Sequence, residues 1–262
     1  MPDVTRYEAG RRVRGTLALT LGLGVFGLMM IAIFPSISAS GVDFEAYAES
    51  LPPAIQAGFN VSSITTIEGF LAVELYQFLW LLLLGLYLAY AGGGTVAGDV
   101  ESGRAELLLA APISRARFLL EKFLSLFVPV VVLNLVVPLF VYGGVIAVGE
   151  SLSAVDLVAV HVLSVPYLLV CGSLGLVLST LVFRSDVAQR GGIALVFALF
   201  LLDSITADTD YEWLGTLSPT RYYDPTEVLV ESTYDVAGAT VLLVAAILLV
   251  YASVAVFRRR DL

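Results

Sequence analysis

Long apolar runs dominate the pattern of hydrophobic and polar positions along the 262 residues of this chain. A helix needs about 20 predominantly apolar residues to cross a bilayer. Six runs approach or exceed this length, at residues 16–34, 71–91, 124–148, 157–183, 191–205 and 236–257. In a soluble protein, six such runs would leave no polar face for water. The pattern therefore predicts an all-α integral membrane protein, with six transmembrane helices in a single domain over residues 1–262.

Arginine and lysine are distributed unevenly among the segments that connect these runs. Four lie before the first run, four between the second and third, two between the fourth and fifth, and three after the sixth. Arg221 alone falls on the other side. Basic residues concentrate in cytoplasmic segments, so we expect both termini to be cytoplasmic, in the plasma membrane. A cleavable signal peptide is the alternative for the N-terminus, but the first run exceeds the roughly 7–15 apolar residues of such signals.

Composition excludes several functions. With 58% hydrophobic and 14% charged residues, the chain differs from ordinary soluble enzymes, and a net charge of −9 argues against nucleic-acid binding. The only lysine, Lys122, precedes Phe123 and cannot belong to a Gly-Lys-Ser/Thr phosphate loop. One histidine and one cysteine are too few for a zinc site. We therefore expect no catalytic residues, no bound cofactor and no metal in this chain.

A glycine motif in the first run has a structural explanation. Gly22, Gly24 and Gly27 form a GxGxxG pattern, but a dinucleotide-binding site requires that pattern between a strand and a helix. Inside a transmembrane helix, glycines more often allow close helix packing.

The most informative segment joins the second and third runs, at residues 97–122. Carboxylates follow the second run, and Gly103 can bend the chain. Residues 104–111 then predict a short helix with three consecutive leucines, which Pro112 ends before Ser114 caps the next helix. A short apolar and charged helix of this kind suits docking into a groove of another protein. The alternative is a helix that only lies on the bilayer.

This segment resembles the cytoplasmic loop of ABC-2-type transporter permeases. The shared pattern E-x-G-x-x-x-x-L-L-x-x-P-x-S-R is carried here by Glu101, Gly103, Leu108, Leu109, Pro112, Ser114 and Arg115. The segments RYEAGRRVRGTLAL, before and into the first run, and LSPTRYYDPTEVL, before the last, are also similar to that family. The six-span layout matches as well, so the resemblance covers essentially the whole chain.

The resemblance implies a membrane permease without ATPase activity of its own. ATP and Mg would bind to a separate ABC ATPase subunit, expected in two copies, and a second permease subunit would complete a homodimer or heterodimer. The short helix would be a coupling helix, and the direction of transport would be export. The residues implied in coupling are Glu101, Gly103, Arg104, Glu106, Leu107, Leu108, Leu109, Pro112, Ser114 and Arg115. Alternatives are a self-contained secondary transporter or channel, and, less favoured by the residues, an intramembrane enzyme.

Within that scheme the leucines would fill an apolar cleft on the ATPase. Glu101, Glu106, Arg104 and Arg115 would make polar contacts around it, and Gly103 and Pro112 would set the angle of the helix.

Three polar residues outside this segment raise separate hypotheses. Asn134 lies in the middle of the third run, where it could line a substrate path or form an interhelical hydrogen bond. His161 lies near the outer edge of the fourth run and is expected to be interfacial. Asn60-Val61-Ser62 is an N-glycosylation sequon on the predicted outer side.

Sorted by predicted side, the net charge separates into two unequal parts. The cytoplasmic side carries 13 basic and 8 acidic residues, and the outer side carries 1 basic and 15 acidic residues. The acidity is thus a property of the outer face. With one lysine among 14 basic residues, it suggests a highly saline exterior, as in haloarchaea. Much of the acidity lies in residues 203–235, which are expected to be either interfacial or re-entrant.

Overall fold

The computed structural model describes residues 3–39, 66–110 and 113–260, and no strand occurs in this part of the chain. Six of its helices are long and apolar enough to cross a membrane, which confirms the predicted number. These spans are Thr5–Ser38, Ile67–Glu101, Arg115–Ala147, Ala154–Leu181, Ser185–Thr206 and Val236–Arg258. The protein is therefore an all-helical, multi-pass membrane protein.

The spans are built from the following elements. The first is α1 (Asp3–Ser38), and the second joins α4 (Ile67–Leu71), η2 (Ala72–Leu84) and α5 (Gly85–Glu101). After α6 (Arg104–Leu109), the third span joins α7 (Arg115–Leu124) and α8 (Phe127–Ala147). The fourth and fifth are α9 (Ala154–Leu181) and α10 (Ser185–Thr206). The short η3 (Glu212–Leu217), η4 (Pro219–Tyr222) and α11 (Pro225–Leu229) precede the last span, α12 (Val236–Arg258).

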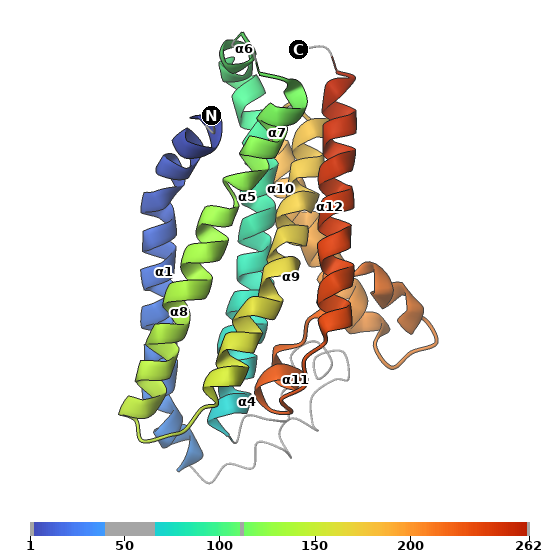
Figure 1. Ribbon diagram of the computed structural model, residues 1–262. Helices are drawn as coiled ribbons and strands as arrows, with labels where there is room; N and C mark the ends of the chain where they lie inside the picture. Colours follow the sequence, from blue (N-terminus) through green and yellow to red (C-terminus); the bar gives the residue numbers. More distant parts are fainter. Residues whose placement is uncertain (1–2, 40–65, 111–112, 261–262) are drawn as a thin grey trace.

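The bundle has two different ends. The start of α1, the end of α12 and α6 all lie at one end, which we call the terminal end, whereas α4 and α11 lie at the opposite end (Figure 1). This arrangement agrees with an even number of spans.

Several helices extend beyond the apolar runs that predicted them. α1 begins at Asp3 rather than at residue 16, and α10 begins at Ser185 rather than at residue 191. Outside the hydrocarbon region a helix continues without apolar side chains until its backbone is capped. Side chains cap the starts of several elements, as where Ser153 accepts the backbone N–H of Asp156 at the start of α9.

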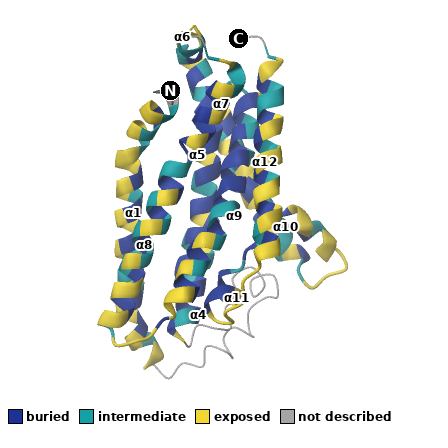
Figure 2. Ribbon diagram, in the orientation of Figure 1, coloured by how far each residue is buried: buried dark blue, intermediate teal, exposed yellow. Residues whose placement is uncertain are grey.

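The second and fourth spans form the centre of the bundle. α9 contacts α5, α10 and α12, while α1 packs against α8 at the periphery. Buried positions accordingly concentrate on α5 and α9, and exposed positions on α1 and α12 (Figure 2). The exposed residues of the outer spans are largely apolar, including Leu139 and Tyr251, each 72% exposed. Such surfaces are suited to contact with lipid.

Glycines bring α5 and α9 into backbone contact. A Cβ atom on Gly175 would lie 2.0 Å from the carbonyl oxygen of Ala89, and one on Gly92 would lie 2.1 Å from that of Gly172. Small residues of this kind permit close approach of membrane helices, where packing replaces the hydrophobic effect as the driving force. In the GxGxxG motif, a Cβ on Gly24 would meet the Phe140 ring at 2.9 Å.

The second span contains an extended π-helical stretch, η2, over Ala72–Leu84. π-Helices usually occur as single turns and often mark functional sites, because their wider turn redirects side chains. Here the Tyr76 and Trp80 rings both pack against the ring of His161 on α9, with centroids 5.3 and 4.9 Å away.

We expect Gly175→Ala to disrupt the α5–α9 contact. The added methyl has no space against Ala89, so the helices must separate, at a cost of about 1–3 kcal/mol or more. Thermal unfolding in detergent should show a clear loss of stability. Gly143→Ala on α8 is the matched control, because nothing lies within 4 Å of its Cβ position. Equal stability of the two variants would contradict this packing.

Candidate functional site

The terminal end carries α6, the short helix that the sequence places between the second and third spans. Gly103 precedes α6 with φ +71°, a left-handed conformation that glycine adopts without strain. The side chain of Arg104 extends back toward the end of α5. Its Nη2 atom lies 2.9 Å from Asp99 Oδ1, and its Nε donates to Ser102 Oγ at 3.0 Å. These contacts fix α6 at an angle to α5.

The leucines of α6 occupy different environments. Leu107 is 75% exposed, whereas Leu108 and Leu109 are partly buried and pack against the hydrophobic core. Glu106 is exposed beside Leu107. The outward face of α6 therefore presents one leucine and one carboxylate.

The other implied coupling residues hold the loop in place. Glu101 Oε2 accepts the backbone N–H of Ser185 at 3.0 Å, which ties the end of α5 to the start of α10. Ser114 caps α7, as predicted, by accepting the backbone N–H of Arg117. Pro112 lies outside the described residues.

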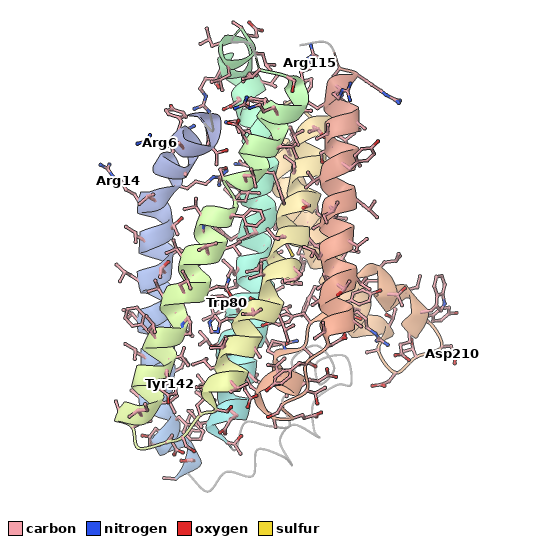
Figure 3. The ribbon with its side chains drawn as sticks, viewed as in Figure 1. Arg6, Arg14, Trp80, Arg115, Tyr142 and Asp210 are labelled. Carbon is pink, nitrogen blue, oxygen red and sulfur yellow. The ribbon has the colours of Figure 1, made fainter. Side chains whose placement is uncertain are left out.

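Arg115 connects the loop to the end of the chain. Its Nη1 atom donates to the backbone carbonyl of Arg260, just beyond α12. Figure 3 shows Arg115 at the start of α7, close to the end of α12.

A buried ion network lies beneath α6, and the sequence interpretation missed it. Lys122 is 1% exposed, and its Nζ lies 2.7 Å from Glu8 Oε1 and also contacts Asp99 Oδ2. Arg104 contacts the other oxygen of Asp99. We call Glu8, Asp99, Arg104 and Lys122 the ion network; two positive and two negative charges balance within it. The one signal in the sequence was a lysine in a chain that otherwise uses only arginine.

The ion network joins four helices that are distant in sequence. Glu8 belongs to α1, Asp99 to α5, Arg104 to α6 and Lys122 to α7. Neighbouring contacts reinforce the junction of α1 with the third span, because Arg12 Nε donates to Ser125 Oγ at 3.1 Å. A movement of α6 would therefore be transmitted to α1, α5 and α7.

Asn134 takes part in a polar cluster inside the bundle. Its Nδ2 donates to the carbonyl of Val130 at 2.7 Å, and its Oδ1 accepts Ser164 Oγ at 3.3 Å. Ser164 Oγ also accepts the Trp80 indole N–H at 2.9 Å. Asn134 thus forms an interhelical hydrogen bond that links the second, third and fourth spans through Ser164.

The expected interfacial position of His161 is wrong. The side chain is 2% exposed, because η2 brings Tyr76 and Trp80 against it. Its Nδ1 atom pairs with the carbonyl of Leu157 at 2.8 Å, while Nε2 and the Tyr76 hydroxyl have no hydrogen-bond partner in the described part of the chain. The Asn60 sequon lies outside the described residues.

The opposite end carries an open cavity of about 360 Å³ beneath η4 and α11. Its polar lining includes Asp203, Arg221, Glu227 and Asp235. Several of these side chains have structural partners: Asp203 Oδ2 accepts Thr220 Oγ1 at 2.7 Å, and Asp235 caps α12. Among the described residues, no group of three or more His, Cys, Asp or Glu side chains is arranged to hold a metal ion.

Three carboxylates surround Glu227 in the segment between α10 and α12. Partial burial, together with repulsion from Asp224, Glu231 and Asp235, raises the pKa of Glu227 above its ordinary value of 4.5. A carboxyl group with a raised pKa binds its proton more tightly in the folded state. Its contribution to stability is therefore present below pH 4.5 and is lost as the pH rises through the raised pKa.

We expect Glu227→Gln to raise the melting temperature at pH 7.5 and to leave it unchanged near pH 4, where Glu227 is already protonated. High salt should reduce the gain at pH 7.5, because exposed charges are screened. Thermal unfolding at both pH values checks this. Glu150→Gln, which removes an exposed carboxylate between α8 and α9, is the control. A gain at pH 4 as large as that at pH 7.5 would contradict the assignment.

We expect Lys122→Met to destabilise the protein by about 3–5 kcal/mol, because two buried carboxylates lose their shared cation. Adding Glu8→Gln and Asp99→Asn should recover much of this loss. Arg184→Gln is the control, since its bridge to Asp186 is exposed and contributes little. Thermal unfolding of the variants checks the prediction. If Lys122→Met behaved like Arg184→Gln, the ion network would not stabilise the fold.

The whole chain was also compared with known proteins. A comparison with curated proteins gave no match. A family model described as ABC-2 family transporter protein matches residues 4–262, which is nearly the whole chain. This match confirms the resemblance that the loop pattern and the six spans indicated, and the chain belongs to the ABC-2 transporter family.

Proposed function

We propose that α6 is the coupling helix of this permease and that it docks onto a separate ABC ATPase subunit. Membership of the family makes the chain a membrane permease of an ABC transporter. The proposal adds two ATPase copies, a second permease subunit as a homodimer or heterodimer, and transport out of the cell. It also places the terminal end, with both termini, in the cytoplasm.

The exposure of Leu107 is the observation that carries this proposal. Leu107 is 75% exposed on a short helix at the tip of the molecule, and a short apolar and charged helix suits a groove on a partner. The helix that presents it is held by the Arg104–Asp99 ion pair and therefore resists bending. Exposed Glu106 beside it would contact a basic residue at the edge of the cleft.

The ion network supplies a physical route from the ATPase to the spans. Closure of two ATPase subunits on ATP would move the docked α6 as a rigid element. Since α6 is fixed to Asp99, and Asp99 shares Lys122 with Glu8, the movement would reach α5, α7 and α1 together. Relative tilting of these spans would then change access to the bundle. Asn134 and Ser164 lie where three of the spans meet, so a role for Asn134 in a substrate path stays part of the proposal.

We expect Leu107→Asp to abolish co-purification with the ATPase while leaving the permease folded, because Leu107 makes little contact with its own chain. Leu217→Asp at the opposite end is the matched control, since Leu217 is 65% exposed. Pull-down from membranes that contain both subunits, followed by ATPase assay, measures the effect. A stable complex of the Leu107→Asp variant would overturn the docking surface. Transport by the lone permease in liposomes without ATP would instead favour a self-contained secondary transporter or channel.

A further inference from the structure

A basic cavity and an apolar groove follow one another along the line where α7 and α12 meet. The cavity lies at the terminal end, measures about 410 Å³ and is lined by Ser114, Arg115, Ala116 and Arg258. The groove measures about 420 Å³ and has no charged residue among its described lining. We call the two together the seam, represented by Arg115, Leu120, Phe123, Val250, Val254 and Arg258.

Helical register makes the two parts of the seam continuous. On α12, Val250, Val254 and Arg258 are spaced four residues apart and so lie on one face. Val254 and Arg258 are about 6 Å apart along the helix axis. Below the arginines, Leu120 and Phe123 continue the apolar wall on α7. The seam thus changes from apolar to basic over roughly one helical turn.

The seam is also a fixed feature of the fold. The rings of Phe118 on α7 and Phe257 on α12 are stacked, with centroids 5.9 Å apart, and both are fully buried. They hold α7 against α12 at the level where the cavity gives way to the groove.

The charges at the mouth of the seam have no acidic partner in the described part of the chain. Arg258 is exposed, and Arg115 donates only to the Arg260 carbonyl. Among the described carboxylates at this end, four are in ion pairs and two, Glu101 and Glu106, are not. The paired ones are Glu8, Asp99, Glu121 and Asp186. A second copy of this chain would therefore bring few free carboxylates to the seam. A ligand with its own negative charge and an apolar tail fits better.

We propose that the seam binds an anionic phospholipid, with its phosphate on Arg115 and Arg258 and an acyl chain in the groove. Arginine guanidinium groups bind phosphate oxygens with paired hydrogen bonds, and basic pockets between transmembrane helices bind anionic headgroups. The position also fits, because the arginines lie where an apolar helix leaves the membrane. The inference requires only that the chain spans a membrane, and it stands or falls independently of ATPase docking.

The test is native mass spectrometry of the full-length chain taken from vesicles of equal parts phosphatidylglycerol and phosphatidylcholine with identical acyl chains. The wild-type chain should retain phosphatidylglycerol about tenfold over phosphatidylcholine, because two charge-assisted contacts favour the anionic lipid. The pair R115Q/R258Q should reduce this preference to about twofold or less. R6Q/R14Q is the matched control, since Arg6 and Arg14 are exposed on α1 at the same end and away from the seam (Figure 3). This control should keep the preference.

A second variant tests the acyl-chain groove without altering charge. Val254→Trp should fill the groove and reduce retention of phosphatidylglycerol, whereas Leu135→Trp on the exposed face of α8 should not. Excess inorganic phosphate should fail to displace the lipid, which separates a lipid site from a free-phosphate site. Equal retention of both lipids by the wild-type chain would overturn the proposal. So would unchanged preference in R115Q/R258Q, or a change in the number of permease copies in place of lipid loss.

Discussion

The sharing of one buried lysine by two buried carboxylates is the interaction on which the terminal end of this protein depends. Lys122 is 1% exposed and contacts Glu8 on α1 and Asp99 on α5. Removing charges from water is costly, and the cost is met here because the charges balance and lie within contact distance. The arrangement specifies geometry: α1, α5 and α7 can meet at this end only with these side chains in register. The same network also positions α6, because Arg104 at the start of α6 pairs with Asp99.

A different interaction holds the middle of the bundle together. There, the backbones of two helices lie in close contact, and charged side chains take no part. Gly92 and Gly175 let α5 and α9 touch, and Ser179 Oγ accepts the backbone N–H groups of Val96 and Ala97 across the same contact. Apolar side chains gain little from leaving lipid for protein, so these close contacts carry much of the helix association. Span two is thus held firmly at α5. Toward the opposite end it becomes π-helical, and Tyr76 leaves its hydroxyl without a partner in the described residues.

Features that depend on local sequence pattern were predicted correctly. Contacts between side chains that are far apart in the sequence were missed. Apolar runs identified all six spans, and the loop pattern identified the family and the short helix. The ion network was not predictable, because Glu8 and Lys122 are 114 residues apart and nothing local pairs them. The sequence also did not show which leucine of α6 is exposed. The orientation of α6, set by Gly103 and Arg104, exposes Leu107 and partly buries Leu108. His161 was misplaced because π-helical packing, rather than its depth in the run, decides its burial.

The two ends of the bundle should respond differently to ionic strength. The acidic composition of the chain should therefore matter mainly at the end opposite the termini. Glu8, Asp99 and Lys122 of the ion network are buried, and salt screens buried pairs weakly. At the opposite end Glu227 is only partly buried, and salt does screen its repulsion from neighbouring carboxylates. Salt would therefore relieve repulsion in the segment between α10 and α12 and would affect the junction of α1, α5, α6 and α7 less. Carboxylates thus outnumber basic residues between α10 and α12, whereas the charges of the ion network at the terminal end sum to zero.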